Sequence, residues 1–186
     1  MIDRLGPPVQ RRAYGSGGIN RVQSPWRANS VHYITILLGS LLPVLLIADV
    51  MPLVPPLGFL IFLGWRLMRP GLMPLWAGVP LGAFDDLFSG QPFGSAILLW
   101  SLTMIALEIL ETRIPWRGFW QDWFTAGLVI VIYILAAMTV SGATLNSHLL
   151  IAMLPQIFLS VLIYPLAARL IAWLDRFRLS RARRIG

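Results

Sequence analysis

Long apolar runs separated by short polar breaks make up most of the chain from residue 31 onward. A helix rises 1.5 Å per residue, so about 20 apolar residues cross roughly 30 Å of hydrocarbon. The pattern predicts an all-α, polytopic membrane protein whose six transmembrane helices occupy residues 31–175. Prolines are expected to kink the first run and to interrupt the sixth. The runs are 31–51, 53–68, 71–88, 93–111, 123–141 and 149–174.

The composition agrees with a lipid environment. Of the 186 residues, 57% are hydrophobic and 12% are charged, with a mean hydropathy of +0.73. A soluble domain carries about 25% charged residues. The length suits one helical bundle without a second domain of useful size. The chain has no cysteine, which excludes disulfides, thiol chemistry and thiolate metal sites.

The polar segment 1–30 contains five arginines, several glycines and prolines, and no periodic pattern. It is expected to be a flexible, basic cytoplasmic tail, with a second basic tail at 176–186. The pair Arg11-Arg12 raises the alternative of a twin-arginine export signal. The first apolar run begins about 19 residues later and no small-x-small cleavage site follows it, so this reading is not favoured.

Arginines, which are all 15 of the basic residues, predict the orientation. They lie in the amino-terminal tail, the second and fourth connections and the carboxyl end, whereas the other three connections hold none. The positive-inside rule then predicts an even number of spans with both termini cytoplasmic. A pI near 11.2 fits anionic lipid headgroups here better than nucleic acid. The residues expected to set orientation or contact lipid include Arg66, Arg69, Arg113, Arg117, Arg176, Arg178, Arg181, Arg183 and Arg184.

Other polar and aromatic groups gather near the same arginine-bearing ends. Glu108 and Glu111 are one turn apart, and Arg66, Arg113 and Arg169 are expected at similar depth, which predicts an interfacial ion-pair cluster. Five tryptophans are expected at headgroup level: Trp65, Trp116, Trp120, Trp123 and Trp173. The basic carboxyl tail is expected to bind anionic lipid; the alternative is a docking surface for a cytoplasmic partner.

Asp85 and Asp86 are two successive carboxylates in an apolar run, where each costs a few kcal/mol at membrane depth. If the third helix begins at Gly71, they lie about 21 to 22 Å along it. Adjacent helical residues point about 100° apart, so the pair cannot easily share a proton as a catalytic dyad does. One is expected to face the bundle and the other the loop or water.

Catalytic and metal sites are not supported by the spacing of polar residues. No other run supplies an aspartate at the same depth, and Ser89 stands where a prenyl-transfer Asp-Asp-x-x-Asp motif needs a carboxylate. His32 and His148 are expected near opposite membrane faces, so they cannot share one metal ion. The chain is therefore expected not to be an enzyme and to have no cofactor.

Gly78 and Gly82 form a small-x-x-x-small pair, and Asp86 extends it at the same spacing. Such stripes let helices approach closely in lipid. Asp86 is therefore expected to face another helix and to accept hydrogen bonds from the backbone at 90–94. The alternative is that Asp86 only helps to end its helix.

At these residues the chain resembles the MreD family of bacterial rod shape-determining membrane proteins. The matching run is Gly-x-x-x-Gly-x-x-x-Asp-Leu-x-Ser-Gly-x-x-x-Gly from Gly78 to Gly94, preceded by Pro55-Pro56, a short apolar helix and Trp65-Arg66. The likeness covers about residues 50–112. It departs from the family pattern at Asp85, which is an additional carboxylate. The resemblance implies a partner or structural motif made of Gly78, Gly82, Asp86, Gly90, Pro92 and Gly94.

The resemblance also implies a non-enzymatic subunit of the cell-elongation complex. Such proteins bind MreC and, through it, MreB, RodA and a class-B penicillin-binding transpeptidase, which build lateral peptidoglycan. The implied fold is similar to the substrate-binding subunits of energy-coupling-factor transporters. That similarity supplies the alternative, a vitamin-transporter subunit with a ligand pocket in its outer half. Residues able to line such a pocket are Asp85, Asp86, Gln91, Asn146 and His148.

Overall fold

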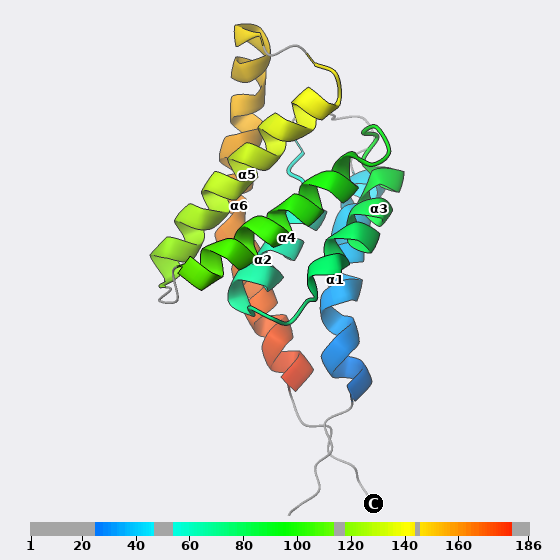
Figure 1. The fold of residues 1–186 in the computed structure, drawn as a ribbon, viewed down its shortest axis with the longest axis vertical. Helices are drawn as coiled ribbons and strands as arrows, with labels where there is room; N and C mark the ends of the chain where they lie inside the picture. Colours follow the sequence, from blue (N-terminus) through cyan, green and yellow to red (C-terminus); the bar gives the residue numbers. More distant parts are fainter. Residues whose placement is uncertain (1–24, 47–53, 114–117, 144–145, 180–186) are drawn as a thin grey trace, which may run out of the picture.

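A computed structural model describes residues 25–46, 54–113, 118–143 and 146–179, and within these ranges the chain is helical without a strand. The all-α prediction is confirmed for this part of the chain. Figure 1 shows the helices running up and down, with the α3–α4 turn toward the end where α6 begins. The elements are α1 (Pro25–Leu46), α2 (Leu57–Met68), the 3₁₀ turn η2 (Leu75–Ala77), α3 (Gly78–Phe88), α4 (Ser95–Arg113), α5 (Phe119–Val140) and α6 (Ser147–Leu179).

Each predicted tail is helical where it adjoins the bundle. α1 begins at Pro25, so the prediction that residues 25–30 belong to a flexible tail is wrong. Proline suits the first turn of a helix because its missing N–H has no intrahelical partner there. At the other end α6 continues to Leu179, and Pro155 and Pro165 lie inside one continuous helix. The prediction that these prolines interrupt it is therefore wrong.

The third apolar run is not one helix. Gly71 has a φ of +78°, outside the helical region, and Pro74 is extended before η2. α3 itself has 11 residues, about 16 Å at 1.5 Å per residue. The third helix does not begin at Gly71, so the expected distance of about 21 to 22 Å along it is wrong: the two aspartates are the eighth and ninth residues of a helix that begins at Gly78.

The core is centred on α2, which packs against α1, α4, α5 and α6. Its side chains are buried on all sides, as in a helix enclosed by others. Phe59 stacks on Tyr133 of α5 with ring centroids 3.8 Å apart, and Phe62 stacks on Trp100 of α4 at 4.7 Å. These aromatic pairs fasten α2 to its neighbours.

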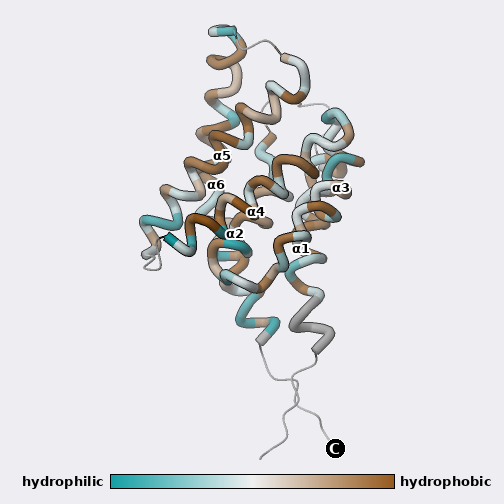
Figure 2. The backbone as a smooth tube through the Cα atoms, in the orientation of Figure 1, coloured by the Kyte–Doolittle hydropathy of each residue, from teal (hydrophilic) through white to brown (hydrophobic). Residues whose placement is uncertain are grey.

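Three of the described helices, α4, α5 and α6, are long and apolar enough to cross a membrane. Figure 2 shows hydrophobic residues along their length. Large apolar side chains on their outer faces are exposed, including Phe124 and Leu128 on α5 and Phe158 and Leu162 on α6. Exposed apolar surface of this extent indicates contact with lipid or protein. α1 and α2 supply shorter apolar stretches.

Candidate functional site

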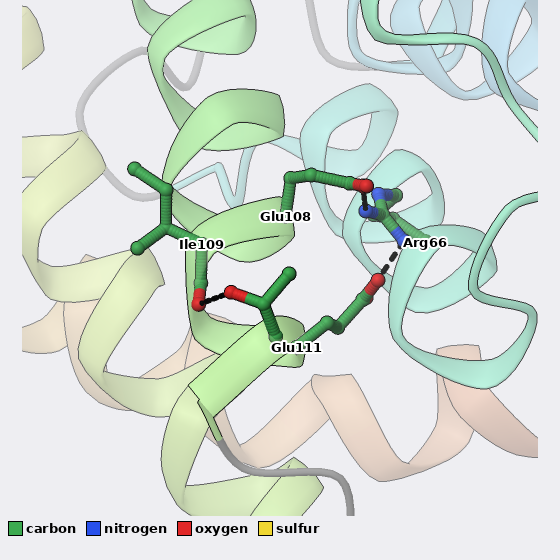
Figure 3. Close-up of polar contacts among 5 residues, drawn as sticks. Arg66, Glu108, Ile109 and Glu111 are labelled. Atoms are coloured by element: carbon green, nitrogen blue, oxygen red, sulfur yellow. Dashed lines mark hydrogen bonds and ion pairs between the residues drawn. The ribbon is translucent and has the colours of Figure 1, made fainter.

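Ion pairs join the carboxyl ends of α2, α4 and α6, which together are called the arginine end. Arg66 of α2 donates to Glu108 at 2.5 Å and to Glu111 at 2.7 Å, both on α4 (Figure 3). The Arg66 side chain is 1% exposed, so its charge is neutralised inside the bundle. The predicted pairing of Arg66 with the two glutamates is confirmed.

A second set of contacts at the arginine end was not predicted. Arg69 donates to Asp175 of α6 at 2.5 Å, and Arg178 lies 3.1 Å from the same carboxylate. Trp65 is fully buried and donates its indole N–H to Thr35 of α1 at 3.0 Å. Trp65 therefore contacts α1 inside the bundle, and its position at headgroup level stays a prediction.

Asp86 binds the amino terminus of α4, and this arrangement is called the aspartate cap. Its carboxylate accepts hydrogen bonds from the backbone N–H of Gly94 at 2.8 Å, Ala96 at 2.8 Å and Ile97 at 3.2 Å. The Ser95 hydroxyl lies 3.1 Å from it. Four N–H groups at a helix start lack intrahelical partners and carry partial positive charge, which explains the position of the aspartate. Asp86 therefore does more than end its own helix.

The glycine stripe makes this approach sterically feasible. A Cβ at Gly82 would lie 2.6 Å from the carbonyl oxygen of Ala96, and one at Gly78 would lie 3.0 Å from the Cα of Ser101. Both distances are shorter than ordinary van der Waals contacts. The prediction that Gly78, Gly82 and Asp86 face another helix is confirmed, and that helix is α4.

The turn between α3 and α4 has two residues in the left-handed region, Gly90 with a φ of +68° and Gly94 with a φ of +100°. Only glycine adopts these angles without steric cost. The Pro92 carbonyl accepts a hydrogen bond from the Ser95 N–H at 3.0 Å, which closes the turn before α4 begins. The glycines at these positions thus direct the Gly94 N–H onto Asp86.

Asp85 points about 100° away from Asp86 around α3 and lines a cavity of about 640 Å³. The cavity is at the end of the bundle opposite the arginine end, and this end is called the cavity end. Polar groups reach it from several elements: Ser40 of α1, Asp85 of α3, Gln91 of the turn, Tyr133 of α5 and Gln156 of α6. Its apolar wall includes Pro43, Val44, Ile134, Met138 and Met153.

The other predicted residues are scattered or lie outside the described ranges. Arg113 and Arg176 are exposed at the ends of α4 and α6, and Arg169 is exposed on α6. Asn146 and His148 are exposed at the start of α6 and do not line the cavity. Arg117, Arg181, Arg183 and Arg184, with Trp116, are outside the residues that the structure describes.

Among the described residues, no group of three His, Asp or Glu side chains is placed to hold a metal ion. The arrangement offers one structural carboxylate at the aspartate cap and one carboxylate facing a cavity. Comparison of the chain with protein-family models, curated proteins and solved structures found no match.

Proposed function

We propose that this chain is a non-enzymatic subunit of the bacterial cell-elongation machinery, of the MreD kind, which holds MreC in the inner membrane. Through MreC it would be joined to MreB, RodA and a class-B penicillin-binding transpeptidase. The observation that supports this is the aspartate cap. Gly78, Gly82 and Asp86 resemble the family motif, and in this fold they act as one unit that fixes α3 against α4.

In this proposal six helices cross the membrane and both termini are cytoplasmic. The sequence places arginines at the arginine end and none in the three connections at the cavity end, which supports that orientation. α3 is short, so its crossing is completed by η2 and the preceding loop. The arrangement would be similar to substrate-binding subunits of energy-coupling-factor transporters.

The rigid α3–α4 unit is the proposed recognition surface. It displays Leu87, 66% exposed, and Phe93, 72% exposed, beside the turn. Large apolar side chains on a fixed scaffold are effective anchors at protein interfaces. Neither side chain is needed for the hydrogen bonds of the aspartate cap, so both can be changed without removing it.

The test is copurification in mild detergent of the full chain with MreC from the same bacterium. The wild-type protein is expected to retain MreC, and the double variant Leu87→Ser, Phe93→Ser to retain about a tenth or less, since an interface anchor contributes about 2 kcal/mol. The matched control is Phe158→Ser on α6, where the phenylalanine is 76% exposed. The control variant is expected to retain MreC as the wild type does.

Cell shape gives an independent readout. Gly82→Leu and Asp86→Leu, which disrupt the α3–α4 unit, are expected to round the cells and to weaken MreC retention. Absence of MreC from the wild-type preparation contradicts the proposed function. Rod shape and MreC retention in both disruptive variants contradict the role of the motif.

The cavity supports a second candidate, a substrate-binding subunit of a vitamin transporter. The volume of the cavity, about 640 Å³, is within the range of small-molecule sites. Asp85 and Gln91 line the cavity, as the transporter alternative predicts. Nanomolar binding of a vitamin by the purified protein would favour this candidate over the first.

A further inference from the structure

Asp85 is a carboxylate that the bundle encloses without supplying a countercharge. The residue is 9% exposed, and the ion pairs formed among the described residues do not include it. Its neighbour Asp86 has the same charge and already binds the start of α4. An enclosed charge without a partner costs several kcal/mol.

Arginine is absent from the three connections at the cavity end. No arginine occurs between Arg27 and Arg66, between Arg69 and Arg113, or between Arg117 and Arg169, and the 15 basic residues include no lysine. The described ion pairs of Arg66 and Arg69 are at the opposite end of the bundle. Among the residues that the structure describes, none supplies a cation to Asp85.

Two hydroxyl groups also line the cavity. Ser40 is 6% exposed, and its hydroxyl lies beside the Asp85 carboxylate, to which it can donate. The Oγ of Ser89, at the end of α3, is buried and has no hydrogen-bond partner. Buried polar atoms normally have partners. These hydroxyls and the Asp85 carboxylate can all accept from a donor in the cavity.

The rest of the wall is mostly apolar, with Pro43, Val44, Ile134 and Met138 around the polar groups. A bare metal ion is bound by several oxygen ligands on all sides, whereas Asp85 is the single carboxylate among the residues that line this cavity. An ammonium or guanidinium group needs acceptors on one side only, and an apolar stem attached to it would contact the apolar wall.

We propose that the cavity binds an organic monocation, an ammonium or guanidinium group on an apolar stem, through Asp85 with Ser40 and Ser89. The group has two sources with the same chemistry, a free amine or a basic side chain of a membrane partner. The proposal goes beyond the assembly function, and only the assignment of the cation's source rests on MreC being the partner.

The test uses the full chain in detergent at neutral pH, with benzylamine as the probe and benzyl alcohol as its neutral analogue. Benzylamine is expected to raise the unfolding temperature to a saturating value, whereas benzyl alcohol gives no saturable rise. Asp85→Asn is expected to weaken benzylamine binding about 10- to 100-fold, because a charge-assisted hydrogen bond contributes about 1.5–3 kcal/mol. Ser40→Ala is expected to weaken it by a smaller factor.

Two further variants separate binding from folding. Val44→Trp changes a half-exposed residue at the rim, leaves Asp85 in place and is expected to abolish saturable binding by filling the cavity. Asp122→Asn removes a carboxylate from the first turn of α5, away from the cavity, and is expected to leave binding unchanged. Equal effects of benzylamine and benzyl alcohol, or full benzylamine binding by folded Asp85→Asn, overturn the proposal.

Copurification of Asp85→Asn with MreC identifies the source of the cation. Loss of MreC together with loss of benzylamine binding assigns the cation to a side chain of the partner. Retention of MreC with loss of benzylamine binding assigns it to a free amine. If wild-type protein retains MreC and shows no saturable benzylamine binding, the cavity proposal fails while the assembly function stands.

Discussion

Asp85 and Asp86 are neighbours with the same side chain and opposite structural roles. Asp86 is expected to be essential for stability, because three backbone N–H groups at the start of α4 depend on it. Asp86→Ala removes these hydrogen bonds and should lower the free energy of unfolding by about 3 kcal/mol. For a chain of this length that is a fall in unfolding temperature of about 10 °C, measured by tryptophan fluorescence in detergent.

Substitution by asparagine at 85 and at 86 supplies the control. Asp85→Asn keeps the shape of the side chain and removes a charge that has no cation beside it, so the unfolding temperature without added amine should stay the same or rise. Asp86→Asn should give an intermediate loss, because the amide keeps one acceptor oxygen. Equal losses for the Asn variants at 85 and 86 would contradict the assignment of the cap to Asp86 alone.

Arg66 and Arg69 form ion pairs at similar distances with very different burial. The Arg66 side chain is 1% exposed and that of Arg69 is 48% exposed. Arg66→Ala leaves Glu111 enclosed without its cation and should cost about 2–3 kcal/mol, less than a fully buried pair because Glu108 is half-exposed. Arg69→Ala should cost under about 1 kcal/mol. Thermal unfolding of the two variants measures the difference. Equal losses of stability would show that burial does not determine how much these ion pairs contribute to stability.

At the scale of elements, the contact between α3 and α4 depends on glycine. Gly82→Ala places a Cβ 2.6 Å from the Ala96 carbonyl oxygen, so α3 must move away from α4 and the aspartate cap must lengthen. The expected cost is about 2–3 kcal/mol, in the range of overpacking substitutions. It is measured as a lower unfolding temperature and as lower MreC retention.

Gly127 of α5 is the matched control for this substitution. A Cβ there would meet Val161 of α6 at 3.7 Å, an ordinary contact. Gly127→Ala should therefore be neutral or stabilise the protein by up to about 1 kcal/mol through helix propensity. A loss at Gly127 as large as that at Gly82 would mean that close approach is not the reason for glycine in α3.

These elements show what the sequence could and could not predict. The glycine stripe and Asp86 were predictable because their four-residue spacing puts them on one face of one helix, and a polar face in lipid needs a partner. The start of α3 was not predictable from hydropathy, because residues 71–77 are as apolar as the helix that follows. Backbone angles at Gly71 and Pro74 decide that boundary.

The cavity was only partly predictable for a related reason. Its polar residues come from four helices and a turn, and periodicity within one helix does not indicate which faces meet. Asp85 and Gln91 could be named because they adjoin the motif. Ser40 and Tyr133 carried no signal in the sequence, since a hydroxyl in an apolar helix usually bonds to its own backbone.

At the scale of the whole molecule, α3 covers only part of α4. Gly78, its first residue, lies against Ser101, and residues 102–113 of α4 extend about 18 Å further toward the arginine end. The chain between Arg69 and Gly78 must cover that distance as a loop with one 3₁₀ turn. A non-helical segment at membrane depth is tolerated only where protein or water satisfies its backbone, so the crossing by α3 is the step on which the proposed six-span topology depends.

The absence of cysteine in the sequence makes this topology directly testable. Phe93→Cys, in the turn after α3, should react with a membrane-impermeant maleimide added to intact spheroplasts. Arg113→Cys, at the end of α4, should react only after permeabilisation. If α3 instead enters and leaves on the cytoplasmic side, Phe93→Cys is protected and Arg113→Cys is labelled. Labelling of both positions from outside would contradict a crossing by α4, whose length and hydropathy favour a span. The pattern of these two cysteines thus decides whether the aspartate cap lies on the periplasmic side, where MreC could reach it.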